Sequence, residues 1–314
     1  MRFFKILLGI LGLILLYNRL ACDFLDLFRS DTTAHPEQLE IRSYGVKRSN
    51  TSTTDLIVIM TPRLSKSFIE RLKRIDENFS DNHTTAILIL HDSSPSLKTI
   101  NTLINSCQRQ LFFTDITQIF NWFPKGFDPC RTPSTYRYRG KWNYHLMIRF
   151  WFKLLFEFTP LQSYDYVMRL DDDSQMQDRW FNVFDEMRKK NAVYFANDLD
   201  VDIETQLPGT MKLKDFTLNY IEKLRIVPKQ KETLEYGFGN TYLRSYFNNF
   251  EVVQLKFFRQ ISVRQWTDAV DRSHGIFLYR WGDAVLRYIT VSIFANAEQV
   301  LHRPMYNLSY CHKC

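Results

Sequence analysis

The chain has 314 residues, of which 45% are hydrophobic and 15% aromatic, so it can bury one large core or two small ones. Its 41 basic and 34 acidic residues give a net charge of +7, which suits anionic ligands or an anionic membrane face but identifies no partner. The sequence contains no zinc-finger spacing, no RNP-like aromatic motif and no run of five basic residues. Nucleic acid is therefore not an expected partner.

The first 21 residues predict a membrane anchor. Arg2 and Lys5 precede an uncharged run at 6–17, which is short for a membrane span. No small-x-small cleavage site follows, so an uncleaved signal anchor is favoured over a cleaved signal peptide. The positive flank would stay cytosolic and the body of the chain would be lumenal. Residues 22–54 are polar and lack a periodic pattern, and we expect them to form a stem.

Sequons and cysteines agree with a lumenal body. The asparagines of the four Asn-x-Ser/Thr sequons are Asn50, Asn78, Asn82 and Asn307. The five cysteines, which allow two disulfides and one free thiol, are Cys22, Cys107, Cys130, Cys311 and Cys314. The last two resemble half of a zinc knuckle, but no second pair exists. A disulfide or two surface thiols are therefore favoured over a metal site.

Residues 55–116 alternate between strand and helix patterns. Apolar runs at 56–60, 86–92 and 111–116 predict buried strands, and the stretches between them predict helices at 65–78 and up to Gln110. Strands joined by helices indicate parallel crossovers and a Rossmann-like half. There is no Gly-x-Gly-x-x-Gly or Walker A motif, so neither dinucleotide nor P-loop binding is supported.

The rest of the chain continues the α/β pattern. Apolar residues repeat at intervals of three and four over 141–158, which predicts a helix with a wide apolar face. The segment 197–235 is polar and has few core signals beyond one helix. The other predicted elements are strands at 163–170 and 192–196 and helices at 180–190, 216–224 and 284–294. We expect one α/β domain with a mostly parallel central sheet and helices on both faces.

Three consecutive aspartates, Asp171, Asp172 and Asp173, follow directly after the strand predicted at 163–170. Adjacent carboxylates repel one another, and hard divalent cations such as Mg²⁺ and Mn²⁺ prefer oxygen ligands. On an extended chain Asp171 and Asp173 would point the same way and Asp172 the opposite way. The pattern suggests a metal site at Asp171 and Asp173. A solvated acidic turn or a helix N-cap is the alternative, and it is the commoner meaning of three aspartates alone.

Two more carboxylates, Glu251 and Asp283, lie among aromatic and apolar residues. An ionised group in such surroundings is destabilising unless it is paired or bound, so both are candidates for chemistry at a cleft. The alternative for Glu251 is a helix cap or an ion pair with Arg244 or Lys256. The alternative for Asp283 is the N-cap of the helix predicted at 284–294.

The order and spacing of Asn249-Phe250-Glu251 and Arg280-Trp281-Gly282-Asp283-Ala284 resemble the C-terminal half of the fungal α-1,2-mannosyltransferase family. The resemblance continues more weakly upstream and covers about residues 55–311. It implies a GT-A glycosyltransferase fold for a catalytic domain at 55–314. It also implies a type II Golgi membrane protein that transfers mannose from GDP-mannose, with Mn²⁺, to an N-linked, O-linked or glycolipid mannose.

The resemblance also implies roles for single residues. Asp171 and Asp173 match the acidic pair that binds metal and donor, although the family has Arg-Val-Glu-Pro-Asp where this chain has Arg-Leu-Asp-Asp-Asp. Glu251 matches the candidate nucleophile, and Asp283 the aspartate of the family's Trp-Gly-Asp. The residues expected in the acceptor or donor pocket are Tyr144, Arg149 and Trp281.

The C-terminus departs from the family. The family ends with an aromatic residue and two histidines, one of them a metal ligand, whereas this chain has Tyr306-Asn307-Leu308. His302 and His312 are the nearby substitutes, and His302 is preferred. His274 is expected to be a structural or acceptor-side residue.

The implied reaction retains the α configuration. Glu251 would form a covalent glycosyl intermediate or stabilise an oxocarbenium ion, and the sequence leaves both routes open. Two other functions also remain open. One is a GT-A glycosyltransferase with another nucleotide sugar, and the other is a catalytically silent lumenal carbohydrate-binding protein.

Overall fold

The computed structural model describes residues 42–43, 54–62, 64, 66–92, 95–132 and 142–313. The predicted anchor at 1–21 and nearly all of the predicted stem at 22–54 lie outside these ranges. Within them, no helix has both the length and the apolar character that crossing a membrane requires.

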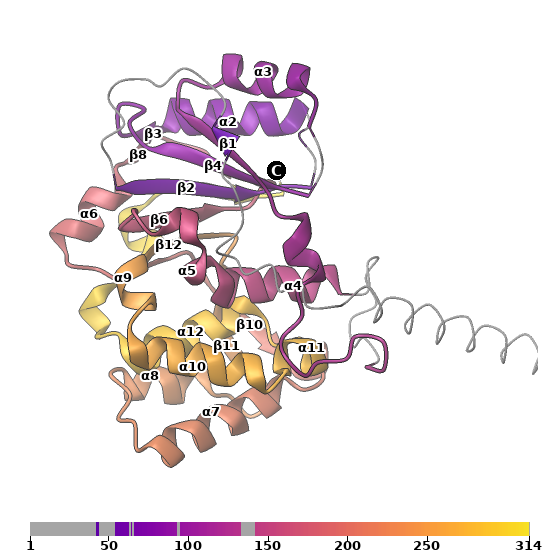
Figure 1. Ribbon diagram of the computed structural model, residues 1–314. Coiled ribbons are helices and arrows are strands. Elements are labelled where there is room, and N and C mark those ends of the chain that lie inside the picture. The colour runs from indigo at the N-terminus through magenta and orange to yellow at the C-terminus, as the bar shows by residue number, and fades with distance from the viewer. Residues whose placement is uncertain are drawn as a thin grey trace, which may run out of the picture.

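An eight-stranded sheet crosses the molecule in the order β1-β5-β4-β2-β6-β12-β9-β13 (Figure 1). The run from β5 to β6 is parallel, as is the pair of β9 and β13, whereas β12 is antiparallel to both of its neighbours. The mostly parallel sheet expected from the sequence is thus confirmed. Its strands are β1 (Arg42–Ser43), β2 (Asp55–Met60), β4 (Ala86–His91), β5 (Leu111–Asp115), β6 (Tyr166–Leu170), β9 (Tyr194–Ala196), β12 (Phe250–Gln254) and β13 (Val300–His302).

Alternate residues of the inner strands enter two different cores. Leu56 and Val58 face one core, and Ile57 and Ile59 face the other. Both faces are covered, so these parallel strands read as continuous apolar runs. Figure 1 shows α2 (Lys66–Asn78) and α3 (Leu97–Ser106) on one side of the sheet. The other side is covered by α4 (Asn143–Arg149), η3 (Phe150–Leu154), α5 (Leu155–Glu157) and α12 (Asp283–Phe294).

Two predicted helices differ from the structure. The helix expected at 141–158 is divided by a π-helical turn, η3. The helix expected at 180–190 begins only at Val183, as α6 (Val183–Lys189), because the side chain of Asn182 accepts a hydrogen bond from Phe184 N and caps it there. The two residues before this cap form β8 (Trp180–Phe181), which pairs with β3 (Phe79–Ser80).

The segment 197–235 is more ordered than its composition suggests. It contains β10 (Leu199–Ile203), which pairs with β11 (Tyr242–Tyr246), and the helices α7 (Thr210–Leu224) and α8 (Lys231–Gly237). Leu213 and Leu234 anchor these helices in a third core around Trp266. The remaining elements are β7 (Ser174–Met176), β14 (Tyr310–His312), α9 (Leu255–Phe258), α10 (Ile261–Arg272), α11 (Gly275–Tyr279), η2 (Thr117–Asn121), η4 (Thr159–Leu161), η5 (Ala297–Gln299) and η6 (Arg303–Tyr306).

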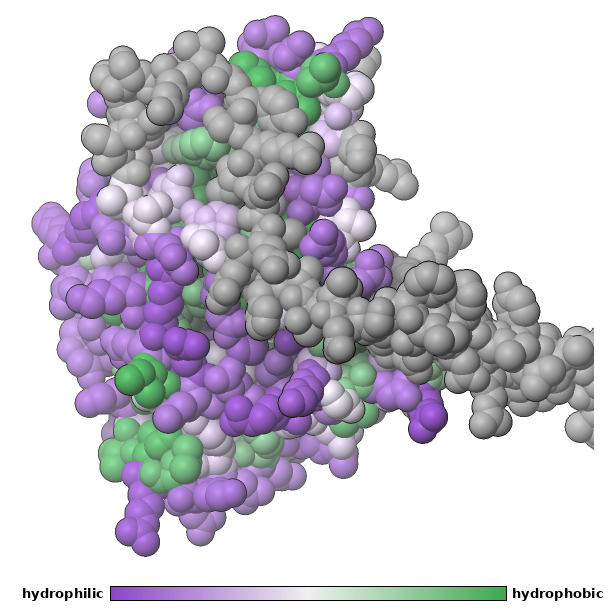
Figure 2. Space-filling view, in the orientation of Figure 1, coloured by the Kyte–Doolittle hydropathy of each residue, from purple (hydrophilic) through white to green (hydrophobic). Residues whose placement is uncertain are grey.

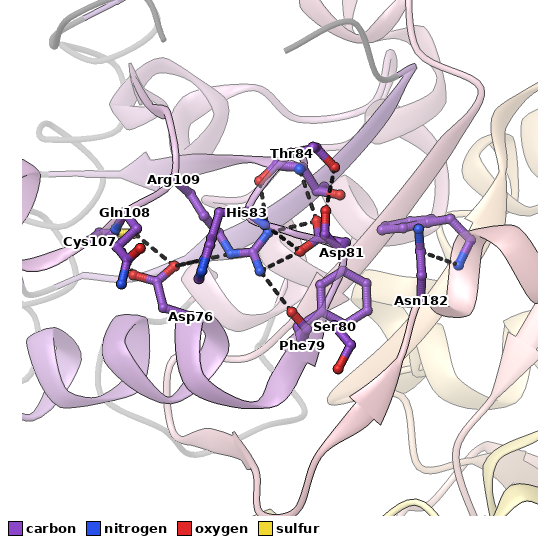
Figure 3. Close-up of polar contacts among 12 residues, drawn as sticks. Asp76, Phe79, Ser80, Asp81, His83, Thr84, Cys107, Gln108, Arg109 and Asn182 are labelled. Carbon is purple, nitrogen blue, oxygen red and sulfur yellow. Dashed lines mark hydrogen bonds and ion pairs between the residues drawn. The ribbon is translucent and has the colours of Figure 1, made fainter. Parts of the chain in front are cut away.

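A buried ionic cluster ties α2 to the strands beside it. The guanidinium of Arg109 lies between two carboxylates, 2.6 Å from Asp81 Oδ1 and 3.1 Å from Asp76 Oδ1 (Figure 3). Burial raises the pKa of the neighbouring Cys107 thiol to about 12, so this free cysteine is inert at neutral pH. Cys130 and Cys311 are disulfide-bonded, which agrees with the preference for a disulfide over a metal site at Cys311.

Where Figure 2 is coloured, the visible surface is mostly hydrophilic, with separate hydrophobic patches. The exposed large apolar side chains of the described residues include Leu97 and Val227. Scattered exposure of this kind is normal for a folded domain and calls for no partner.

Candidate functional site

A cavity of about 440 Å³ opens where the parallel strands end. Met60 is the last residue of β2, and Asp92, Ile116 and Asp171 each follow directly after β4, β5 and β6. Ligands of open α/β sheets bind at this carboxyl edge. Aromatic side chains from the helical side, including Tyr144 and Trp151, form another wall. We call this the strand-end cavity.

All three aspartates, Asp171, Asp172 and Asp173, line the strand-end cavity. The expectation that Asp172 faces away from the other two is therefore wrong. The reason is that β6 ends at Leu170 and the chain then turns, with Ser174 N donating to Asp171 O over 3.0 Å. Strand alternation does not apply in a turn.

Asp171 lies against Arg169, whose Nε donates to Asp171 Oδ1 over 2.9 Å. Burial raises the pKa of Asp171 to about 6, although Arg169 acts in the opposite direction. The charges of Asp283 and Asp173 raise this pKa further. A second positive charge close to Asp171 would relieve this repulsion, as a bound cation would.

Arg169 also reaches Asp283, which sequence reasoning had singled out. Its Nη1 donates to Asp283 Oδ2 over 2.5 Å, and Asn248 Nδ2 donates to the same oxygen over 2.8 Å. Asp283 is the first residue of α12, but the N-cap is Gly282, so the capping alternative is not what the structure shows. Asp283 is buried behind the strand-end cavity and does not line it.

Glu251 lies opposite Arg169 on the neighbouring strand β12. Its two oxygens accept hydrogen bonds from Arg287 Nε, over 2.9 Å, and from Arg287 Nη2, over 3.2 Å. Glu251 is 1% exposed and Arg287 0%, and neither lines the strand-end cavity. The partners considered from the sequence, Arg244 and Lys256, do not pair with Glu251. Its partner is Arg287, which lies farther along the chain and which α12 brings beside Glu251.

The structure brings His312, and not the preferred His302, to the acidic cluster. β14 pairs with β7 so that His312 lies opposite Ser174, and His312 Nδ1 is 3.2 Å from Asp173 Oδ1. His302 ends β13 and lines a different cavity. Three strand spacings separate β13 from β6, about 14 Å along the sheet.

Tyr144 lines the strand-end cavity, as expected for a pocket residue. Arg280 Nη2 donates to its hydroxyl over 2.6 Å, and the same guanidinium is 3.5 Å from Asp202 Oδ2. This arginine belongs to the Arg-Trp-Gly-Asp stretch, so that stretch supports a residue of the cavity wall through the hydrogen bond of Arg280 to Tyr144.

Three other candidates have structural contacts away from this cavity. Arg149 pairs with Asp271, with Nε to Oδ1 at 2.7 Å. Trp281 is 3% exposed, and its Nε1 donates to Gly209 O over 3.0 Å. His274 Nε2 is 3.1 Å from Lys125 O, which agrees with a structural role.

Sequence reasoning gave no role to several residues of the site, among them Arg169 and Trp151. The guanidinium carbon of Arg169 lies 4.4 Å from the centre of the Trp151 ring, within cation–π range. The signal for Arg169 was a charge inside an otherwise apolar strand that leads into three carboxylates. Trp151 gave no such signal, because it reads as one of many apolar residues on its helix.

The donor chemistry of the cluster fits a hard divalent cation. It offers carboxylate oxygens from Asp171, Asp172 and Asp173 and an imidazole nitrogen from His312, which are ligands that Mn²⁺ accepts. Within the described part of the chain no three such side chains already form a closed metal cluster.

Comparison with known proteins shows the family to which the chain belongs. A family model described as "Glycolipid 2-alpha-mannosyltransferase" matches residues 41–314. The chain belongs to this family. Because the match includes the strand-end cavity and its whole acidic cluster, the family assignment applies to the part of the chain that the structure describes.

Two curated relatives show how far the sequence of this chain has diverged from theirs. The chain is 25% identical over 187 residues to glycolipid 2-alpha-mannosyltransferase of Saccharomyces cerevisiae, covering 55% of this chain and 41% of that protein. It is 24% identical over 246 residues to O-glycoside alpha-1,2-mannosyltransferase homolog 2 of Schizosaccharomyces pombe, covering 74% of this chain and 65% of that protein. It thus spans less than two thirds of the length of either relative.

Solved structures show the same fold. Core-mannan synthase A (CmsA/Ktr4) from Aspergillus fumigatus, in its Mn/GDP form, has a TM-score of 0.71 at 18% identity, covering 86% of this chain and 76% of that one. Mannosyltransferase Ktr4p from Saccharomyces cerevisiae in complex with GDP also has a TM-score of 0.71, at 19% identity. The match covers 96% of this chain and 80% of that one. The GT-A glycosyltransferase fold expected from the sequence is confirmed.

Proposed function

We propose that the chain is a retaining α-1,2-mannosyltransferase that moves mannose from GDP-mannose to a mannose-containing glycan. The observation that carries the proposal is the acidic cluster at the strand ends, within a chain of the glycolipid 2-alpha-mannosyltransferase family. The Mn/GDP and GDP complexes of the two solved relatives support a metal-assisted guanine nucleotide donor.

Asp171 and Asp173 are the proposed metal and donor ligands, and His312 joins them because of its contact with Asp173. Bound Mn²⁺ would supply Lewis-acid stabilisation to the diphosphate leaving group. Lys313 lines the same cavity and adds a positive charge beside that group. Tyr144 is proposed to contact the donor, with its hydroxyl oriented by Arg280.

Glu251 and Asp283 are the proposed catalytic carboxylates. Retention of configuration requires Glu251 to serve one face of the sugar, by a covalent intermediate or by stabilising an oxocarbenium ion. Both oxygens of this buried carboxylate accept hydrogen bonds from Arg287, and Arg169 joins Asp283 to the acidic cluster. For Glu251 to reach a sugar, its surroundings must open, because it is 1% exposed.

The proposed setting is the lumen of the Golgi, with the chain held by its N-terminal anchor as a type II membrane protein. The sequence pattern at 1–21 and the sequons support this setting. The acceptor would be an N-linked, O-linked or glycolipid mannose.

A second candidate is a glycosyltransferase of the same fold with another nucleotide sugar. It is favoured by one observation, the replacement of the family's Glu-Pro-Asp by Asp171-Asp172-Asp173.

The test is GDP release from GDP-mannose, with and without Mn²⁺, in the presence of α-mannoside acceptors. Asp171→Asn should abolish Mn²⁺-dependent release, while Asp178→Asn, an exposed aspartate outside the cavity, should leave it unchanged. Release from UDP-sugars but not from GDP-mannose would favour the second candidate. If the unmutated protein shows neither turnover of GDP-mannose nor affinity for GDP, the proposal that the chain is an enzyme is refuted.

A further inference from the structure

A second cavity, of about 660 Å³, lies at the opposite edge of the sheet from β5. We call it the β13 cavity, because Val300, Leu301 and His302 of that strand line it. Residues of α8, β11 and α12 are among the others that line it. His302 lies in one row with Ala196, Glu251 and Arg169 across the sheet, so the β13 cavity is separated from the strand-end cavity by two intervening strands.

Aromatic faces dominate the lining of the β13 cavity. Four of the residues that line it are tyrosines, namely Tyr236, Tyr246, Tyr288 and Tyr306. The exposed side chains of Tyr236 and Met305 lie on its rim, 64% and 78% exposed. The C–H face of a pyranose is weakly positive and apolar, so it packs favourably on the negative face of an aromatic ring.

Two polar groups in the β13 cavity have no hydrogen-bond partner among the described residues. Tyr246 is 2% exposed, yet its hydroxyl neither donates nor accepts a hydrogen bond there. The ring of His302 contacts Tyr246 with centroids 6.1 Å apart, and its nitrogens are also unpaired within that part of the chain. The hydroxyls of Tyr288 and Tyr306, by contrast, bond to Thr233 O and Glu186 Oε1.

Tyr246 is buried and His302 is half-buried, and the hydroxyl and the imidazole of these two residues can both bond to a ligand that brings its own hydroxyls. Burial lowers the pKa of His302, so at neutral pH its imidazole is uncharged and offers one donor and one acceptor. A phenol and a neutral imidazole can each donate to and accept from a sugar hydroxyl.

The charge of the lining excludes a phosphate ligand. Among its described residues are one lysine, Lys190, and one glutamate, Glu298, and no arginine. A nucleotide or phospholipid headgroup would need a concentration of positive charge that is absent from this lining. A neutral ligand with both hydroxyls and apolar faces fits best.

We propose that the β13 cavity binds a neutral oligosaccharide, namely a mannose-containing part of the glycan acceptor that lies away from its reacting end. The choice of mannose rests on the proposed function, whereas the carbohydrate class rests on the lining alone. Such a site would increase the affinity for long acceptors without taking part in the transfer step.

The test is saturation-transfer NMR of α-1,2-mannotriose with the full chain, comparing the wild type with a Tyr246→Phe/His302→Leu double variant. The double variant removes both polar groups and keeps the apolar volume. We expect its Kd for mannotriose to rise about tenfold. Tyr220→Phe is the matched control, because Tyr220 lies on α7 outside both cavities, and it should bind as the wild type does.

A rim variant keeps the proposal testable should the double variant fail to fold. Met305→Arg changes an exposed side chain, and its larger charged head should obstruct the cavity and weaken mannotriose binding. Equal affinity in the wild type and the folded variants, or no binding of mannotriose at millimolar concentration, would overturn the proposal.

Failure of this proposal is distinguishable from failure of the proposed function. Asp171→Asn should lose GDP release and keep mannotriose binding, because Asp171 belongs to the strand-end cavity. Variants of the β13 cavity should still release GDP with a single mannoside as acceptor, and their KM should rise only for longer acceptors.

Discussion

Arg287 of α12 and Glu251 of β12 form a fully buried ion pair in which both carboxylate oxygens accept hydrogen bonds from one guanidinium. The pair joins the last long helix to the strand inserted between β6 and β9. Arg287 Nη2 also donates to Trp151 O over 2.9 Å, so the same side chain reaches the helix that walls the strand-end cavity. The proposed catalytic carboxylate is thus part of the framework of the domain.

We predict that removing Arg287 destabilises the protein strongly. Arg287→Met leaves the charge of Glu251 buried without a partner, which typically costs about 3–5 kcal/mol in the free energy of unfolding. Urea unfolding would measure this loss. Lys73→Met, which breaks the exposed pair with Glu70, is the control and should change stability by about 0–1 kcal/mol. A similar small effect in both variants would contradict the role given to Arg287.

Glu251→Gln separates the structural and the catalytic roles of Glu251. A glutamine keeps one acceptor oxygen for Arg287, so a large part of the fold should survive. If Glu251 also acts on the sugar, kcat for mannosyl transfer should fall by at least about 100-fold, since the amide has no negative charge. A folded Glu251→Gln enzyme with wild-type kcat would exclude Glu251 from the chemistry.

We predict that Arg280 acts through Tyr144. Arg280→Met removes the hydrogen bond that orients the Tyr144 hydroxyl, and losing one such bond should raise KM for the donor about three- to tenfold. Tyr144→Phe should have a similar effect on KM, and the double variant should add little to either single variant, because both changes remove the same Arg280–Tyr144 hydrogen bond. Steady-state kinetics of the three variants test this, and fully additive effects would refute the coupling.

His145 should weaken the fold at acid pH. Burial lowers its pKa to about 4, with the Arg280 charge acting in the same direction, from an ordinary value of 6.5. Between these values the unfolded chain binds more protons than the folded one, so the free energy of unfolding falls as the pH drops from about 6.5 to 4. His145→Phe should flatten this decline in urea unfolding at pH 7 and pH 4.5. An unchanged decline would show that His145 does not contribute.

The sequons should differ in occupancy when the full chain is expressed through a eukaryotic secretory pathway. Asn82 and Asn307 are exposed, whereas Asn78 Nδ2 donates to Met176 O and Gln177 O over 2.6 and 2.9 Å. We expect glycans on Asn82 and Asn307 but not on Asn78, because a glycan on Asn78 would break both contacts. Glycosidase digestion and peptide mass spectrometry would measure this, and a glycan on Asn78 would contradict it.

Local pattern predicted the first half of the fold well. The strands β2, β4, β5 and β6 are largely continuous apolar runs, so their type follows from the residues alone, and the helices between the first three predicted parallel crossovers. The inserted strand β12 was not predicted, because Phe250–Gln254 becomes a strand only through pairing with β6 and β9. Pairing between segments that lie far apart in the chain cannot be predicted from the residue pattern of one short segment.

In the site, too, features that follow from local sequence could be predicted and features that depend on long-range pairing could not. The position of Asp171 and Asp173 beside the cavity could be predicted, because they follow directly after a recognisable strand. His312 could not be preferred over His302, since its place depends on the pairing of β14 with β7, whose partners lie far apart in the chain. The partner of Glu251 was missed for a similar reason, because Arg287 is held opposite it by the packing of α12.

Direct binding of Mn²⁺ tests the central claim that the strand-end cavity holds the metal and the donor. The loss of the free Mn²⁺ signal in electron paramagnetic resonance, measured with GDP present, reports this binding without relying on turnover. We predict that the wild type and Asp178→Asn bind Mn²⁺ equally, and that Asp171→Asn/Asp173→Asn binds at least about tenfold more weakly. Equal affinity in the folded double variant would contradict the account.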